Sequence, residues 1–163
     1  MSAQPHPFLP ALFPVKVSFT PTPKPTFTFE GLDPNNNLLV KTGMATIVLQ
    51  LVPAEGQALT FNESPVTWFG EASPACMTVQ RNSDTQVTIV NYNTNMEPGE
   101  PEPYDFEISI WCDGIGYMSQ DPTILNAQIP PTPLPGCDDG DRDRDDCRDE
   151  GQRVKRGQAL RAV

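Results

Sequence analysis

The sequence predicts an all-β protein, an antiparallel and immunoglobulin-like β-sandwich of eight or nine short strands. Proline and glycine are abundant, with 19 and 11 among 163 residues, which disfavours long helices. Apolar and polar residues alternate with a period of two in many short runs, as they do in half-buried strands. Turn residues separate these runs, and no run shows the helical period of 3.6.

Each expected strand follows from local alternation or from apolar density. Val15, Val17 and Phe19 alternate with polar residues, and the prolines of 21–25 then exclude that spacer from the centre of a sheet. The run 45–52 is densely apolar, which predicts a central strand covered on both faces. Strands are expected at 15–19, 26–30, 45–52, 59–61, 66–69, 76–81, 86–92 and 104–112. In the last of them, one face carries Phe106, Ile108, Ile110 and Cys112.

Three zones divide the chain. Residues 1–14 form a proline-rich arm whose four large apolar side chains favour either docking, onto the domain or onto a second subunit, or disorder. Residues 15–130 form the sandwich, with a hairpin turn expected at 81–84. Residues 131–163 comprise a proline spacer and a charged tail, acidic and then basic, which is expected to be disordered.

Charge and hydropathy limit the classes of partner and the cellular location that are expected. Residues 1–136 hold four basic side chains against thirteen acidic ones, so phosphate backbones and anionic lipids are disfavoured. No apolar stretch approaches the ~18 residues of a membrane span, and prolines at positions 5, 7, 10 and 14 interrupt the segment where a secretion signal would need an apolar helix. A cytoplasmic protein is therefore expected.

The sequence predicts no catalytic residue and no cofactor. Its only histidine, His6, lies in the arm, which removes imidazole-based triads and histidine–zinc sites from the folded domain. Carboxylates remain, and the densest group is Glu97, Glu100, Glu102 and Asp105. We interpret them as a rigid, solvated loop. The alternative is a carboxylate-dependent enzyme acting on a small neutral or cationic substrate.

Cysteines and the acidic tail predict no metal site. Cys76 and Cys112 are expected to be separate buried thiols, because the cytosol keeps thiols reduced. Cys137 and Cys147, in the tail, allow oxidation or adventitious metal binding.

The tail also matches part of a calcium loop. Asp139, Asp141, Asp143 and Glu150 occupy its first, third, fifth and twelfth positions, but Arg144 stands where the loop needs glycine. A Ca²⁺-dependent scaffold is thus an alternative to a disordered tail.

Aromatic residues provide the remaining candidates for a site. We assign most of them to core packing, and several lying together on the surface would mark a binding or self-association patch. The set comprises Trp68, Phe69, Tyr92, Tyr104, Trp111 and Tyr117.

Four segments resemble a known family. They are 61–68 (FNESPVTW), 91–95 (NYNTN), 104–108 (YDFEI) and 121–126 (DPTILN). Together they resemble the DP-EP family, a small group of uncharacterised bacterial proteins. The resemblance implies a small β-sandwich domain with no assigned activity, and therefore no catalytic residues.

These observations favour a non-enzymatic module that acts by binding or self-association. Unpaired edge strands and an apolar arm offer main-chain hydrogen bonds to a partner, which is how strand addition works. A homodimer is the simplest outcome.

Overall fold

The computed structural model describes residues 10–70, 74–120 and 122–129. Contacts divide the chain into the units 1–130 and 131–163, and the second unit lies outside the described residues, as do residues 1–9 of the arm. The described residues form ten strands and no helix. The strands are β1 (Ala11–Thr20), β2 (Thr26–Glu30), β3 (Asn37–Val40), β4 (Ala45–Leu51), β5 (Leu59–Trp68), β6 (Met77–Arg81), β7 (Gln86–Asn91), β8 (Glu102–Cys112), β9 (Ile115–Met118) and β10 (Thr123–Asn126).

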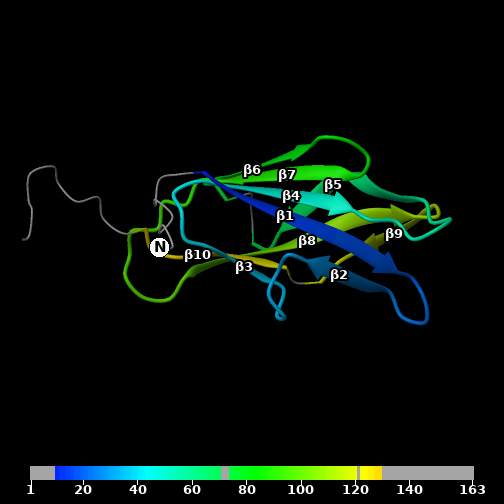
Figure 1. Ribbon diagram of the computed structural model, residues 1–163, viewed down its shortest axis with the longest axis horizontal. Coiled ribbons are helices and arrows are strands. Elements are labelled where there is room, and N and C mark those ends of the chain that lie inside the picture. The colour runs from blue at the N-terminus through cyan, green and yellow to red at the C-terminus, as the bar shows by residue number, and fades with distance from the viewer. Residues whose placement is uncertain (1–9, 71–73, 121, 130–163) are drawn as a thin grey trace, which may run out of the picture. The chain divides into compact units, whose positions relative to one another are not determined.

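Two sheets pack against each other in a sandwich-like arrangement (Figure 1). The first sheet has the order β2-β1-β4-β7-β6. The second has the order β3-β10-β8-β5, with β9 paired to the far half of β8. The all-β prediction is therefore confirmed. No helix of the described ranges is both long and apolar enough to cross a membrane.

Both sheets are mixed, which corrects the expectation of an antiparallel sandwich. Strand β1 runs parallel to β4, with Ala11 opposite Ala45 and Val17 opposite Leu51. Strand β3 likewise runs parallel to β10. Each parallel pair joins strands that are far apart in the sequence. Alternation of residues along a strand indicates which of its faces is buried, but it does not indicate whether a distant strand pairs with it in the parallel or the antiparallel direction.

Strand β1 begins at Ala11, four residues before the start expected from the sequence. Residues 11–14, placed in the arm by sequence, pair with β4 and so dock onto their own domain. Pro14 is accommodated opposite Val48, while Leu12 remains 67% exposed.

The central strand β4 has only one fully buried face. Its burial alternates strictly, with Ile47 and Leu49 buried and Val48 half-buried between them, and Val52 beyond its end is exposed. Coverage on both faces was therefore a wrong expectation. The density of β-branched and leucine side chains reflects its central position between β1 and β7.

Three short strands were not predicted from the sequence. Strands β3, β9 and β10 have four residues each, which is too short for an alternating pattern to stand out. By contrast, the segments 59–61 and 66–69 belong largely to one strand, β5, whose register against β8 shifts between Phe61 and Val66. The hairpin turn expected at 81–84 is present, since the amides of Asn82 and Ser83 both donate to the carbonyl of Gln86.

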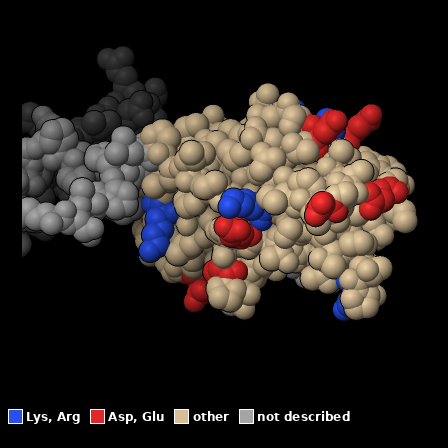
Figure 2. Space-filling model, turned by 45° about the vertical axis from the view of Figure 1, so that its right-hand side comes forward, with Lys and Arg blue, Asp and Glu red and all other residues tan. Residues whose placement is uncertain are grey.

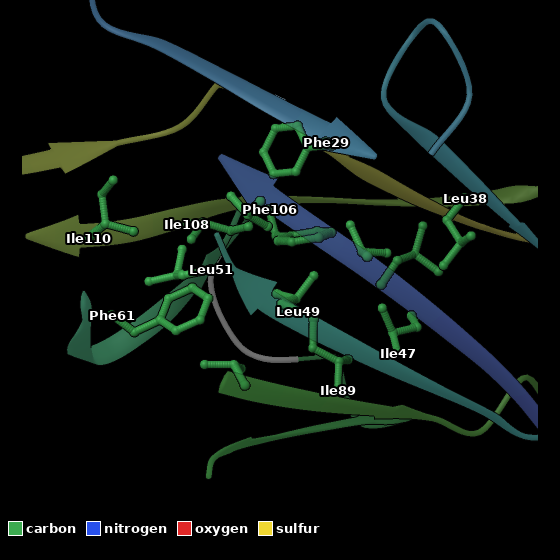
Figure 3. Packing of buried hydrophobic residues seen from close by; sticks show 14 of the residues in the cluster. Phe29, Leu38, Ile47, Leu49, Leu51, Phe61, Ile89, Phe106, Ile108 and Ile110 are labelled. Carbon is green, nitrogen blue, oxygen red and sulfur yellow. The ribbon is translucent and has the colours of Figure 1, made fainter. Parts of the chain in front are cut away.

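The core lies between the two sheets (Figure 3). The face predicted for β8 is correct, since Phe106, Ile108, Ile110 and Cys112 are all buried. Opposite them lie side chains such as Ile47, Leu49 and Ile89 from the first sheet. Trp68 packs on Phe106 with ring centroids 5.4 Å apart, and Phe19 of β1 meets Tyr117 of β9 at 4.6 Å.

Candidate functional site

The acidic candidates separate into one residue that lines a hollow and three that do not. Glu97 and Glu100 are exposed on the loop between β7 and β8, and Asp105 on β8 accepts a hydrogen bond from the Thr123 hydroxyl at 2.5 Å. Glu102 lines a surface depression that the other three do not line. The predicted carboxylate cluster is therefore not brought together in one concave site.

The depression brings together side chains from three strand ends and has a volume of about 560 Å³. We call it the Tyr92–Tyr104 depression. Its polar lining comes from Cys76 before β6, Tyr92 and Thr94 after β7, and Glu102 and Tyr104 on β8. Pro74 and Ala75 complete the wall. Two of the aromatic candidates thus share a concave surface with one of the carboxylate candidates.

The Tyr104 phenol is held in its neutral form. Burial is the main cause that raises the pKa of Tyr104 above its ordinary value of 10.0, and the adjoining Cys76 and Glu102 side chains raise it further. Removing the phenolic proton would place a second negative charge next to the Glu102 carboxylate. Tyr104 therefore remains a hydrogen-bond donor inside the depression.

The segment 91–95 supplies this site and also joins the two sheets. The side chains of Asn91 and Asn93 are buried, whereas Tyr92 and Thr94 between them are exposed and line the depression. Asn93 Nδ2 donates to the carbonyl oxygens of Val40 and Ala127, at 3.3 and 2.8 Å. The buried asparagines thus anchor this segment, and the side chains between them face the depression.

Two more asparagines complete this polar connection. Asn91 and Asn126 exchange side-chain hydrogen bonds across the sheets at 2.6 and 3.2 Å. Asn95 Nδ2 donates to the Asn126 carbonyl at 2.8 Å, and the Asn95 carbonyl accepts the amide of Ile129. Sequence reasoning missed this network. The only signal was the unusual spacing of three asparagines at every second position.

The other aromatic candidates are divided between core and surface. Trp68 is buried, and Tyr117 packs against the core. Phe69 and Trp111 are 52% and 44% exposed. The Trp111 ring lies against the backbone of Gly116 on the neighbouring strand, so part of this tryptophan covers a glycine.

Edge strands are the second candidate feature, and most of them carry a device that hinders pairing with another chain. Strand β2 follows Lys24 and Pro25, and β5 contains Glu63 and Pro65 in its irregular segment. The edge of β3 is partly occupied by Asp33. Its carboxylate accepts a hydrogen bond from the Asn37 amide, and its own amide donates to the Asn37 carbonyl.

Strand β6 lacks these protections. Its first four residues, 77–80, are uncharged and include no proline. The amide of Tyr92 donates to the Cys76 carbonyl at 2.7 Å, and the amide of Asn82 donates to the Gln86 carbonyl at 2.9 Å. Because hydrogen-bonded positions alternate along an antiparallel pair, the backbone groups of Val79 and Arg81 point away from β7.

The end of β6 is nevertheless held in place. The Arg81 guanidinium donates to the Asp84 carboxylate at 2.8 Å and to the Phe61 carbonyl at 3.1 Å. The Phe61 amide donates in turn to the Asp84 carbonyl. The β6–β7 hairpin is thus fixed to β5 of the other sheet, which orders the free edge.

Cysteine chemistry follows the expectation in part. Cys76 and Cys112 are free thiols, of which Cys112 is buried and Cys76 half-buried. Burial and the nearby Asp113 carboxylate raise the pKa of Cys112. In the part of the chain that the structure describes, no group of three or more His, Cys, Asp or Glu side chains is arranged to hold a metal ion.

Several sequence candidates fall outside the described ranges. They are His6 in the arm, and Cys137, Cys147, Asp139, Asp141, Asp143, Arg144 and Glu150 in the tail. The Ca²⁺ scaffold therefore stays an untested alternative.

Charged side chains are few on the face of the domain shown in Figure 2, where broad uncharged areas separate them. The ion pair of Lys16 and Glu30, at 3.3 Å, is exposed to solvent and links β1 to β2.

Compared with known proteins, the chain matches no protein-family model and no curated protein.

Proposed function

We propose that this protein is a non-enzymatic binding module that self-associates through the free edge of β6. The supporting observation is that β6 is an ordered edge strand with uncharged residues at 77–80 and outward-facing backbone groups at Val79 and Arg81. Because residues 11–14 are already paired with β4, the proposed contact rests on β6 rather than on that part of the arm.

The simplest assembly is a two-fold dimer in which β6 pairs antiparallel with its copy around Val79. In this register each Val79 exchanges two main-chain hydrogen bonds with its equivalent, and the Arg81 amide of one subunit reaches the Met77 carbonyl of the other. The Met77 amide is already used, since it donates to the Pro74 carbonyl at 3.0 Å. Arg81 faces methionine in this arrangement, so no like charges oppose each other.

Sedimentation velocity of the full chain tests the proposal. Thr78 and Gln80 are exposed on β6, and the double substitution Thr78→Lys, Gln80→Lys adds two edge charges of the kind that block strand addition. We expect a dimer at tens of micromolar for the native chain and a monomer for this variant. The matched control is Ser18→Lys, Thr20→Lys, which adds the same charge to exposed positions of the interior strand β1.

Two results would contradict self-association through β6. One is a native chain that stays monomeric at these concentrations. The other is a control variant that dissociates as far as the β6 variant, which would assign the effect to net charge.

We further propose that the sandwich is immunoglobulin-like, that the chain is related to the bacterial DP-EP family and that it acts in the cytoplasm. Two sheets of this size around one core support the immunoglobulin-like arrangement. Segment 91–95, one of the four resembling segments, joins the two sheets through hydrogen bonds to Asn126, and this structural role supports the relationship to the DP-EP family. The free thiols of Cys76 and Cys112 support a reducing compartment.

A further inference from the structure

We propose that the Tyr92–Tyr104 depression binds a small organic cation that carries an ammonium group. The residues of β6 itself, Met77–Arg81, are not among the described residues that line this site. Its volume of about 560 Å³ lies within the range of small-molecule sites, roughly 300–1,000 Å³.

The charge of the lining selects the sign of the ligand. Among the described residues that line the depression, Glu102 alone is charged, and this residue is exposed. Glu97 and Glu100 lie on the loop that leads into the same strand. The four basic residues of the described ranges, Lys16, Lys24, Lys41 and Arg81, do not line it. An anion would therefore meet uncompensated repulsion, whereas a cation gains a counter-ion.

The aromatic lining favours an organic cation over a metal ion. Tyr92 is 48% exposed, so its ring is accessible, and Tyr104 forms part of the same lining. Aromatic ring faces attract ammonium groups through their quadrupole, and proteins use this attraction to recognise quaternary ammonium ligands. A metal ion would need several oxygen donors in one place, and the described lining residues include a single carboxylate, that of Glu102.

The hydrogen-bonding groups in the depression are suited to orient such a ligand. Tyr104 keeps its phenolic proton next to Glu102. The phenol is therefore uncharged, and the Glu102 carboxylate remains available as a hydrogen-bond acceptor. Thr94 contributes a hydroxyl group to the lining, on the segment that Asn93 and Asn95 anchor. Because hydrogen bonds within the protein hold this segment, little ordering cost is added on binding.

Titration of the isotope-labelled full chain with choline, followed by NMR, tests the site. Choline supplies a quaternary ammonium, and 3,3-dimethyl-1-butanol is its neutral counterpart of nearly equal shape. We expect choline to shift the Tyr92 and Tyr104 ring signals saturably, and the alcohol to bind at least about fivefold more weakly.

Two matched variants locate the charge that matters. Glu102→Gln should weaken choline binding by about fivefold, and Glu63→Gln, an exposed carboxylate on β5, should leave it unchanged. The amide spectrum of each variant reports that the fold is intact. Absence of saturation at millimolar choline, equal binding of choline and the alcohol, or equal loss in both variants would overturn the proposal.

Discussion

Asn91 and Asn126 exchange two side-chain hydrogen bonds across the interior of the sandwich, from Nδ2 of each to Oδ1 of the other, at 2.6 and 3.2 Å. Asn91 is 0% and Asn126 1% exposed, so neither amide has water as an alternative partner. Each side chain thereby meets part of the hydrogen-bonding need of the other buried amide. The pair also connects the end of β7 to β10 of the other sheet.

Replacing both members of this pair should cost less than the sum of the two single replacements. Asn91→Leu or Asn126→Leu leaves the remaining amide buried without its partner, and we expect each to lower the free energy of unfolding by about 1–3 kcal/mol. The double variant replaces both amides by apolar groups of similar shape. Its loss should be smaller than the sum of the two single losses.

Urea unfolding of the three variants measures this coupling. Strictly additive losses would show that the two side chains act independently, in contradiction to their mutual hydrogen bonds.

Gly31 is required by a close approach of two backbones. Its φ is +115°, and a Cβ at this position would lie 2.6 Å from the carbonyl oxygen of Pro14 on β1. Gly31→Ala should therefore combine the cost of a strained φ with that of a steric clash, and we expect a loss of about 2–5 kcal/mol.

Gly99 provides the matched control for this prediction. Its φ is +125°, but a Cβ there would meet nothing within 4 Å, so Gly99→Ala carries only the conformational cost. The difference between the two unfolding free energies, measured in urea, isolates the clash with Pro14. Equal losses would contradict the close approach.

Alkaline pH should destabilise the fold. The pKa of Cys112 and that of Tyr104 are both raised by burial relative to ordinary values of 9.0 and 10.0. The folded state therefore keeps protons that the unfolded chain releases above these values, so stability is complete at lower pH and falls as pH rises.

Unfolding free energies measured in steps from neutral pH to pH ~11 test this linkage. Tyr104→Phe removes one titrating group and should flatten the fall above about pH 10, whereas Cys112→Ala should flatten its onset at about pH 9. Curves that stay parallel to that of the native chain would show that neither group is linked to unfolding.

Sequence reasoning was most successful where the structure depends on neighbouring residues. The burial of Phe106, Ile108 and Ile110 follows directly from the period of two, because a strand alternates its side chains between its faces. The turn at 81–84 was equally local. Strands β3, β9 and β10 were missed, because four residues contain too few alternations to distinguish a strand from a turn.

The all-β class, the buried face of the longer strands and the side chains available for chemistry could be predicted from the amino-acid sequence, since these depend on composition and on contacts between near neighbours. The folded structure was needed to show that β1 runs parallel to β4, that Asn91 bonds Asn126, and that Tyr92 and Glu102 line one depression. These relationships join residues distant along the chain, and their energies are realised only when both sheets are packed together.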